Sequence, residues 1–332
     1  MRCHAITSLG RRAGAIMTAT AVAAALALLG TPTPANASAS PYELRVITHN
    51  IAGSMNFDGS ARALDGVNTE IDRFGPDVVM LTEVCESQVR AFKDDHPGWH
   101  IRFSVMIDNQ SSCETAGSGE PYGTRQGQML ASPHPISNRS AHPLGHPDHD
   151  ETGAQARTKW FTLLCGDISI PGQSREGLRA CVTHLRAFNQ PEDHRAREAQ
   201  TKRIREVLHD EIHQKGKAVT LGGDFNAKPN WNAMDDIYRL DRDSKYTGRG
   251  DFYEADQTDP KYFQDHGSVT CAARVCRNGQ HTKDTHDLGK SRKIDYLFIS
   301  RNVTHGGRVS GLAPDDYGSD HRLYRGLFEI QY

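Results

Sequence analysis

Eight polar side chains of this sequence stand where strands are predicted to begin or end. They are carboxylates, amides and imidazoles, the groups that bind divalent cations, position water and transfer protons. Taken singly, each has an ordinary structural explanation, such as an Asx turn, a helix N-terminal acid or a hydrogen-bonded strand histidine. Taken together, they have the groups that metal-assisted hydrolysis of a phosphate ester requires. The eight are Asn50, Glu83, His184, Asp224, Asn226, Asp295, Asp320 and His321.

The residue types favour Mg²⁺, with Mn²⁺ or Ca²⁺ as alternatives. Mg²⁺ prefers oxygen ligands and keeps several waters, so one or two carboxylates and an amide suffice. A metal and protonated imidazoles offset the charge that develops during attack on a phosphodiester, and a carboxylate positions the water. Zinc is disfavoured, because no close set of His and Cys ligands is evident.

Apolar runs and amphipathic stretches predict the elements that must position these side chains. Short apolar runs are typical of buried strands, and apolar residues at helical spacing indicate helices. The order of elements predicts an α/β fold with sheets and helices in layers. Strands are predicted at Leu44–Ile51, Val78–Thr82, Gln128–Ser132, Trp160–Ile170, Leu178–Leu185, Val219–Leu221, Ile294–Ile299 and Tyr324–Ile330, and helices at Ala61–Phe74, Glu86–Asp95 and Pro191–Gln214.

The longest helix, Pro191–Gln214, is predicted to be capped by Asn189 and ended by Gly216. Its apolar stripe is predicted to comprise Ala196, Ala199, Ile204, Val207, Leu208 and Ile212. Two long stretches without periodicity, Ile107–Tyr122 and Asp241–Lys293, are predicted to be loops.

The first 37 residues are predicted to be a secretory signal peptide. Arg2, Arg11 and Arg12 form a positive region before the apolar run Ala13–Gly30, and Ala35-Asn36-Ala37 fits a small-x-small cleavage site. Cleavage after Ala37 is the first choice and cleavage after Ala39 the second, and a retained membrane anchor is the alternative. Residues 38–332 then form a single catalytic domain, which we expect to be secreted and monomeric with no obligate protein partner.

Composition excludes several classes of protein. Charged residues are 24% and hydrophobic residues 37%, which argues against wholesale disorder, collagen and a polytopic membrane protein. The net charge is −2, and it becomes −5 after loss of residues 1–37, so the chain is no basic coat for nucleic acid.

Six cysteines remain after cleavage, and an even number in an exported chain predicts three disulfides. A hairpin folded about residue 173 places Cys165 opposite Cys181, within reach of a disulfide. Cys271 and Cys276 would close a short loop, which leaves Cys85 for Cys113. Unpaired buried cysteines are the alternative.

Six segments carry the eight polar residues in contexts that resemble the endonuclease/exonuclease/phosphatase superfamily, the deoxyribonuclease I-like fold. The resemblance spans Val46 to Leu323 and implies a four-layer α/β/β/α sandwich, with two packed mixed β-sheets flanked by helices. It also implies that the strand ends converge in one cleft. The segments are VITHNIA (46–52), VVMLTEV (78–84), CVTHL (181–185), LGGDFNA (221–227), KIDYLFIS (293–300) and GSDHRL (318–323).

The resemblance also implies roles for these residues. Glu83 is the expected main metal ligand, with Asn50 beside it and Asp320 in the same region. Asp224 would orient or deprotonate the attacking water, and Asn226 and His184 would hold phosphate oxygens. His321, held by Asp295, would act as an acid, base or phosphate donor.

Export and the absence of an inositol-phosphatase signature favour a secreted nuclease that cuts DNA or RNA. The alternatives are a sphingomyelinase-type phospholipase and, less favoured, a binding module without catalysis. Residues 274–293 carry a local charge of +4 that could follow a phosphate backbone, and Trp231 could stack on a base or a lipid head group. Arg125, Arg186 and Lys228 are the candidate substrate-binding residues.

Overall fold

Two parallel strands at the centre of one sheet carry Asn50 and Glu83. In this computed structural model β1 (Tyr42–Asn50) pairs with β2 (Val78–Cys85), with Asn50 opposite Thr82. The sheet has eight strands in the order β13-β14-β1-β2-β4-β3-β7-β6. Its other strands are β3 (His100–Ile107), β4 (Gln126–Ser132), β6 (Asp148–Asp150), β7 (Arg157–Lys159), β13 (Val309–Leu312) and β14 (Tyr324–Ile330).

A second, six-stranded sheet carries His184, Asp224 and Asp295, in the order β11-β12-β10-β9-β8-β5. Here β9 and β10 are parallel, and the other pairings are antiparallel. Both sheets are therefore mixed. The strands are β5 (Ile136–Pro143), β8 (Thr162–Ile168), β9 (Leu178–His184), β10 (Ala218–Asp224), β11 (Phe252–Glu254) and β12 (Asp295–Ser300).

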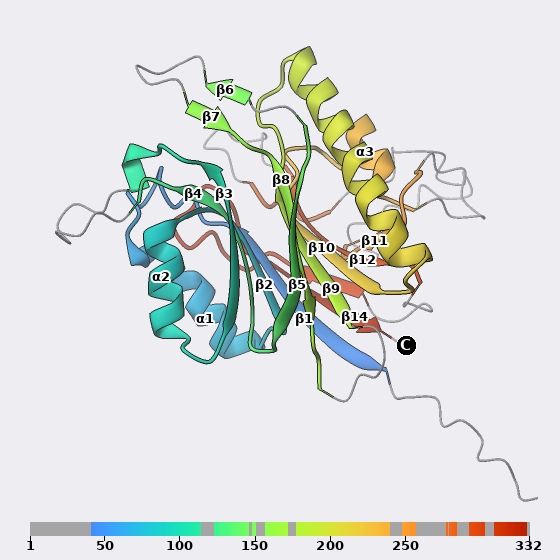
Figure 1. Ribbon diagram of the computed structural model, residues 1–332, viewed down its shortest axis with the longest axis horizontal. Helices are drawn as coiled ribbons and strands as arrows, with labels where there is room; N and C mark the ends of the chain where they lie inside the picture. The colour runs from blue at the N-terminus through green and yellow to red at the C-terminus, as the bar shows by residue number, and fades with distance from the viewer. Residues whose placement is uncertain are drawn as a thin grey trace, which may run out of the picture. The chain divides into compact units, whose positions relative to one another are not determined.

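Helices cover the outer faces of the two sheets (Figure 1). α1 (Asp65–Phe74) and α2 (Glu86–Asp95) pack on the eight-stranded sheet, and α3 (Pro191–His213) packs on the six-stranded sheet. Short 3-10 helices span Ala61–Leu64, Ser111–Cys113 and Asn232–Asp236. The structure describes residues 41–113, 123–145, 148–150, 157–171, 177–239, 248–256, 277, 279–283, 292–302 and 309–330, all of which belong to one unit, Ala39–Tyr332.

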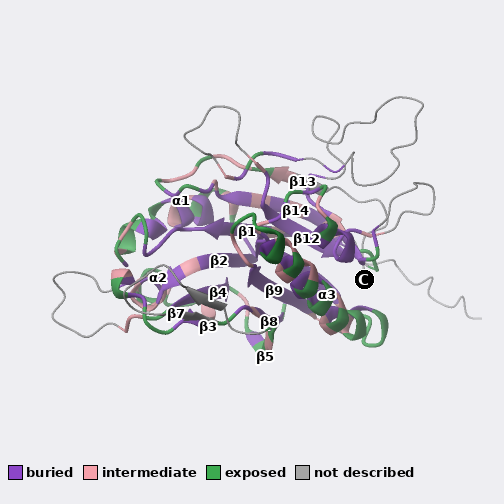
Figure 2. Ribbon diagram, turned by 90° about the horizontal axis from the view of Figure 1, so that it is seen from above, coloured by how far each residue is buried: buried purple, intermediate pink, exposed green. Residues whose placement is uncertain are grey.

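Strand periodicity explains the layers. Successive side chains point to opposite faces, so Val78 and Met80 face the other sheet while Val79 and Leu81 face α1 and α2. Figure 2 shows the buried strands of both sheets between the helices. The predicted α/β/β/α sandwich is confirmed. In the described part of the chain, no helix has both the length and the apolar character needed to cross a bilayer.

Two predictions about α3 were wrong. Its N-cap is Gln190 rather than Asn189, and the Asp193 carboxylate accepts from the Gln190 backbone N–H at 2.8 Å. Ala199 is exposed, whereas the polar Asp193, Arg197 and Gln200 are buried in the first half of the helix. These polar side chains hydrogen-bond to the segment between β9 and α3, so that half of the helix packs through polar contacts.

The sequence analysis did not predict six of the strands, namely β3, β5, β6, β7, β11 and β13. β5 lies at a sheet edge with mostly exposed side chains, so its sequence, ISNRSAHP, has no apolar alternation. Long loops were expected over 107–122 and 241–293, yet parts of them form short elements, including Ser111–Cys113 and β11.

Two of the three predicted disulfides are confirmed. Cys165 and Cys181 face each other across β8 and β9 and are bonded, and Cys85 is bonded to Cys113. The second disulfide ties the end of β2 to the short helix Ser111–Cys113. Cys271 and Cys276, like the predicted signal peptide, lie outside the described residues.

Two basic residues that the sequence analysis placed in a nucleic-acid-binding run are buried in ion pairs instead. Lys293 Nζ lies 2.9 Å from Asp256 Oδ2 and 3.1 Å from Glu254 Oε1, and all three side chains are 1% exposed or less. Arg277 pairs with Asp235 at 2.8 Å in the same manner. A buried carboxylate needs a partner, so these cations hold the fold together and do not face solvent.

Replacing Lys293 with Met should lower the free energy of unfolding by about 3–5 kcal/mol, because Glu254 and Asp256 would be buried without a cation. The measurement is urea unfolding followed by circular dichroism. Lys215→Met is the matched control: Lys215 pairs with Glu211 on the surface, and its loss should cost less than about 1 kcal/mol. Equal midpoints for the two variants would contradict this account of the buried cluster.

Candidate active site

Strand register brings the catalytic candidates to one edge of the sandwich. Asp224 stands opposite His184 in the parallel β9–β10 pair and opposite Asp295 in the antiparallel β10–β12 pair. The three residues thus form a row across the end of the six-stranded sheet. Asn50 ends β1 in the other sheet, and His321 precedes β14, the antiparallel neighbour of β1.

A buried hydrogen bond between the sheets joins Asp295 to His321. The Asp295 Oδ2 atom lies 2.8 Å from His321 Nδ1, and both side chains are almost fully buried. Ser319 Oγ accepts from the His321 backbone N–H and donates to the Asn50 carbonyl, which fixes the loop before β14. The imidazole is therefore held in one orientation, with its Nε2 atom facing Asp224 at 3.7 Å.

The carboxylates around His321 favour the protonated form of its imidazole. Burial opposes the charge, but Asp295 and then Asp224 outweigh it and raise the pKa of His321 from 6.5 to about 9. A cationic imidazole donates from both ring nitrogens, so Nε2–H is available to an oxyanion while Nδ1–H is bound to Asp295. This arrangement suits stabilisation of phosphoryl charge and protonation of a leaving oxygen.

Asn50 links the two acids of the site. Its Nδ2 donates to Glu83 Oε1 at 3.0 Å and to Asp224 Oδ2 at 3.1 Å. Its Oδ1 accepts from the Ala52 backbone N–H at 3.1 Å. In this orientation the amide nitrogen faces the carboxylates, so Asn50 positions Glu83 and Asp224, and it would have to reorient to offer an oxygen to a metal.

Backbone irregularities aim the functional side chains. Glu83 has φ 56° within a β-bulge between Leu81 and Val84, and a bulge redirects a side chain from its expected face. Asn226 has φ 49°, its backbone N–H donates to Asp224 Oδ1, and its Nδ2 donates to the Leu185 carbonyl. Positive φ values are unfavourable for a residue such as Glu83, whereas Asn tolerates them, and such values concentrate at functional sites.

These residues surround a cleft of about 590 Å³. Asn50 and Asp295 lie behind its wall, where they orient the residues that do reach it. Arg186 also lines the cleft, and its Nε donates to Asp193 at 2.6 Å. The predicted site residues on the wall itself are Glu83, His184, Asp224, Asn226, Asp320 and His321.

The other two predicted substrate-binding residues are not part of the cleft lining. Arg125 makes a two-pronged contact with Glu86 at the start of α2. Lys228 is exposed near Trp231. Trp231 itself packs against the core under α3 and lies beneath the Arg197 guanidinium at 5.1 Å, so its ring has a structural partner already.

Lys283 is a cleft residue that the sequence analysis did not single out. Its Nζ lies 2.8 Å from His321 Nε2 and 2.5 Å from Asp320 Oδ2. Lys283 and protonated His321 are both donors, so the two must move apart before an anionic oxygen can accept from both. The basic run 274–293 contained the indication, but only Lys283 and Arg292 of that run are cleft residues in the described part of the chain.

The acids of the cleft fit a hard divalent cation. Glu83 has a partly exposed carboxylate at the cleft wall, and Asp320 offers a second. Burial alone would raise the pKa of Asp320, but His321 and Lys283 lower it overall, so this group is ionised. Mg²⁺ takes one or two such carboxylates and completes its shell with water and substrate oxygens.

A family model for the endonuclease/exonuclease/phosphatase family matches residues 47–321. The chain belongs to this family. Its members are phosphoesterase hydrolases that generally use divalent metal ions, so the fold and the acidic cleft agree with the assignment. No curated protein sequence matches the chain.

Solved structures share the family fold at low identity. The human Nocturnin catalytic domain with bound sulfate has a TM-score of 0.59 at 18% identity and covers 89% of this chain and 96% of its own. An endonuclease/exonuclease/phosphatase from Beutenbergia cavernae has a TM-score of 0.57 at 18% identity, and the match covers 87% of this chain and 72% of that protein. D. rerio TDP2 complexed with a single-strand DNA product has a TM-score of 0.55 at 15% identity, and the match covers 87% of this chain and 99% of that protein.

Replacing Asp295 with Asn should lower the pKa of His321 from about 9 towards its ordinary value of 6.5. Because the folded pKa lies above the unfolded one, the pair stabilises the protein fully below pH 6.5 and progressively less up to pH 9. The measurement is an NMR titration of the imidazole in EDTA. Asp251→Asn, which removes a carboxylate beside His213 instead, should leave this titration unchanged. An unaltered His321 pKa in the Asp295 variant would exclude Asp295 as its cause.

Proposed function

We propose that this protein is a secreted, Mg²⁺-dependent phosphodiesterase, and most specifically a nuclease that hydrolyses DNA or RNA. The observation that carries the proposal is a cationic His321 held by Asp295 at the wall of an open cleft that also contains Glu83, Asp224 and Lys283. That cleft offers a site for a divalent cation and donors for an anionic oxygen in the same space. Hydrolysis of a phosphodiester requires both.

In this mechanism Glu83 holds the metal, with Asp320 in the same region and Asn50 keeping Glu83 in place. Bound Mg²⁺, or Mn²⁺ or Ca²⁺ in its place, supplies Lewis-acid polarisation of a phosphate oxygen. Asp224, buried and fixed by Asn50 and Asn226, orients the attacking water. His321 would donate its Nε2 proton to the leaving oxygen, and the Asp224 carboxylate would take the proton of the attacking water. His184 and Lys283 would hold non-bridging oxygens. Asn226 would add a donor once it leaves the Leu185 carbonyl.

Nucleic acid is the favoured substrate because three cations line the cleft. A phosphate backbone could lie along the positive charges of the cleft wall, which come from Arg186, Lys283 and Arg292. D. rerio TDP2, which has the same fold, was solved with a single-strand DNA product. Arg125 and Lys228 would contribute only outside the cleft.

A sphingomyelinase-type phospholipase is the second candidate, because the cleft lining includes two exposed apolar side chains. Met55 is 73% exposed and Phe188 66% exposed. Exposed apolar residues at an active-site mouth are also the means by which an enzyme contacts a lipid interface. A catalytically silent binding module remains the third candidate.

Secretion and a single mature domain, residues 38–332, are part of the proposal. The two disulfides of the described region are consistent with an oxidising compartment. We expect the mature protein to act as a monomer.

The test compares supercoiled plasmid with sphingomyelin vesicles, using mature protein with and without EDTA. We expect Mg²⁺-dependent nicking of the plasmid, and a loss of about 10²–10⁴-fold in rate for His321→Ala. His134→Ala is the control, since His134 also contacts an aspartate but lies away from the cleft lining. Release of phosphocholine with intact plasmid would move the protein to the phospholipase class. Inactivity on both substrates would favour the binding module.

A further inference from the structure

Phe188 is an exposed aromatic residue held in a strained backbone conformation beside the proposed active site. Its side chain is 66% exposed and its φ is 69°, a left-handed value that a bulky residue rarely adopts. It lies four residues after His184, in the segment that joins β9 to α3, and it lines the cleft. Strain at an exposed position indicates that the placement of the ring serves a purpose other than packing.

A buried arginine fixes this segment. Arg197, on α3, is fully buried, and its Nη1 donates to the carbonyls of Arg186, Ala187 and Phe188 at 2.7, 3.3 and 2.8 Å. Gln200 adds a hydrogen bond from its Oε1 to the Arg186 backbone N–H. Burying a guanidinium is costly unless it is hydrogen-bonded. Here the bonds of Nη1 go to three consecutive carbonyls of one surface segment, while Nε and Nη2 are buried without a hydrogen-bond partner.

We propose that Phe188 is a stacking platform for a nucleobase next to the scissile phosphate. This inference rests on the proposed nuclease function. Aromatic faces stack on any base and bind single strands without sequence preference. The same segment carries Arg186, so it pairs a phosphate-binding cation with a base-binding ring, as a single-strand groove requires. Met55, 73% exposed in the same cleft lining, offers a second apolar contact.

The charge around Phe188 favours a base over a lipid tail. Arg186, Lys283 and Arg292 share the cleft with the ring, which suits a polyanion with bases. A lipid-inserting surface presents several neighbouring apolar side chains. Here Phe188 and Met55 are the only large apolar side chains that are exposed among the described residues of the cleft lining.

The test removes the ring from the enzyme and the base from the substrate. Phe188→Ala, Phe188→Trp and wild type are assayed on a single-stranded deoxyoligonucleotide and on an abasic oligomer with the same sugar-phosphate backbone. We expect Phe188→Ala to lose about five- to a hundredfold in kcat/KM on the normal strand, mainly through KM, and to equal wild type on the abasic strand. Phe188→Trp should retain wild-type behaviour on both strands.

Trp160→Ala is the matched control, because Trp160 is another exposed aromatic, 48% exposed, that does not line the cleft. Equal losses for Phe188→Ala on both strands, or no loss on either, would overturn the platform while leaving the nuclease intact. Lost binding to sphingomyelin vesicles with unchanged DNA cleavage would assign the ring to a membrane instead. A wild-type protein that cuts neither strand would overturn the nuclease proposal itself.

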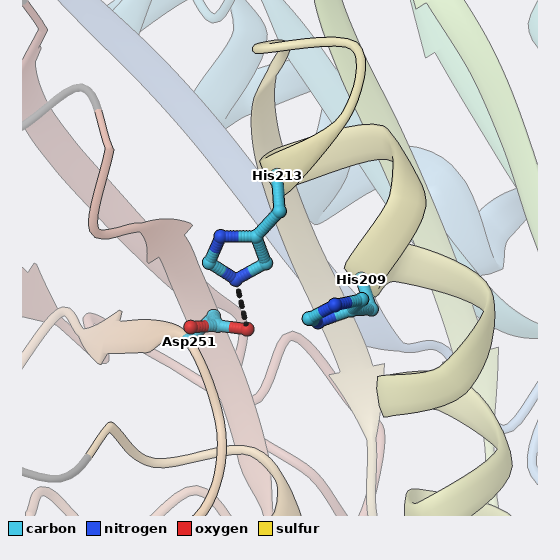
Figure 3. Close-up of side chains that lie close together, drawn as sticks. All are labelled: His209, His213 and Asp251. Carbon is cyan, nitrogen blue, oxygen red and sulfur yellow. Dashed lines mark hydrogen bonds and ion pairs between the residues drawn. The ribbon is translucent and has the colours of Figure 1, made fainter.

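A different observation supports a second site, for a transition metal. His209 and His213 stand four residues apart on α3, and Asp251 approaches them from the segment that enters β11 (Figure 3). One ligand atom from each residue lies within 4.8 Å of the others, and His213 Nε2 is 2.8 Å from Asp251 Oδ2. The sequence analysis found no close His set, yet this i, i+4 pair lies on one helix face.

The ligand types point to zinc or a similar ion. Imidazole and carboxylate bind Zn²⁺ at about 2.0–2.2 Å, whereas Mg²⁺ prefers oxygen alone. Both histidines are exposed to solvent, and Arg301 holds the other oxygen of Asp251 at 3.0 Å. We infer that Zn²⁺ binds here and ties the last turns of α3 to the segment preceding β11, separately from the cleft.

Isothermal titration with ZnCl₂ tests this site in the presence of Mg²⁺. We expect one zinc equivalent bound by wild type to be missing from His209→Ala and from His213→Ala. It should persist in His134→Ala, which breaks a His–Asp contact that has no third ligand in the described part of the chain. The same stoichiometry in all four proteins would exclude the site.

Discussion

The hydrogen bond between Asp295 and His321 joins the two sheets at the edge where the cleft opens. Asp295 begins β12 in the six-stranded sheet, and His321 precedes β14 in the eight-stranded sheet. Neither group would remain charged alone in so buried a place, because desolvation disfavours the charged form of each. Their pairing keeps the imidazole protonated, so the contact that closes one end of the sandwich also creates its strongest candidate acid.

The rest of the site is arranged around that pair by buried hydrogen bonds and by unusual backbone conformations. Asn50 bridges Glu83 and Asp224 and also lies beside His321. The bulge at Glu83 and the left-handed turn at Asn226 carry conformational strain, which the surrounding strands must offset. Phe188 also has a left-handed backbone conformation, and Arg197 holds its segment through hydrogen bonds to three carbonyls. Buried hydrogen bonds and strained backbone conformations thus occur at the residues whose side-chain orientation the site depends on.

The basic residues divide between folding and the cleft. Arg277 and Lys293 are buried with three acids, where they neutralise Asp235 of the helix Asn232–Asp236, Glu254 of β11 and Asp256 just after it. Lys283 and Arg292 belong to the same charged run but face the cleft. A run of basic residues in a sequence does not indicate which side chains will be buried, because burial depends on where acids from distant segments lie in the fold. The local charge near the cleft is therefore smaller than the composition suggested.

The sequence by itself determined the layered fold, the strand ends that carry the polar residues, and the pairing of Cys165 with Cys181. These depend on local periodicity and on hairpin register, which are properties of neighbouring residues. Tertiary structure decided the N-cap of α3, the edge strand β5 and the polar contacts of Arg197. It also brought Lys283 to His321 and turned the Asn50 amide towards Glu83. Each of these contacts joins residues from separate segments, so its energy exists only once the sheets have packed.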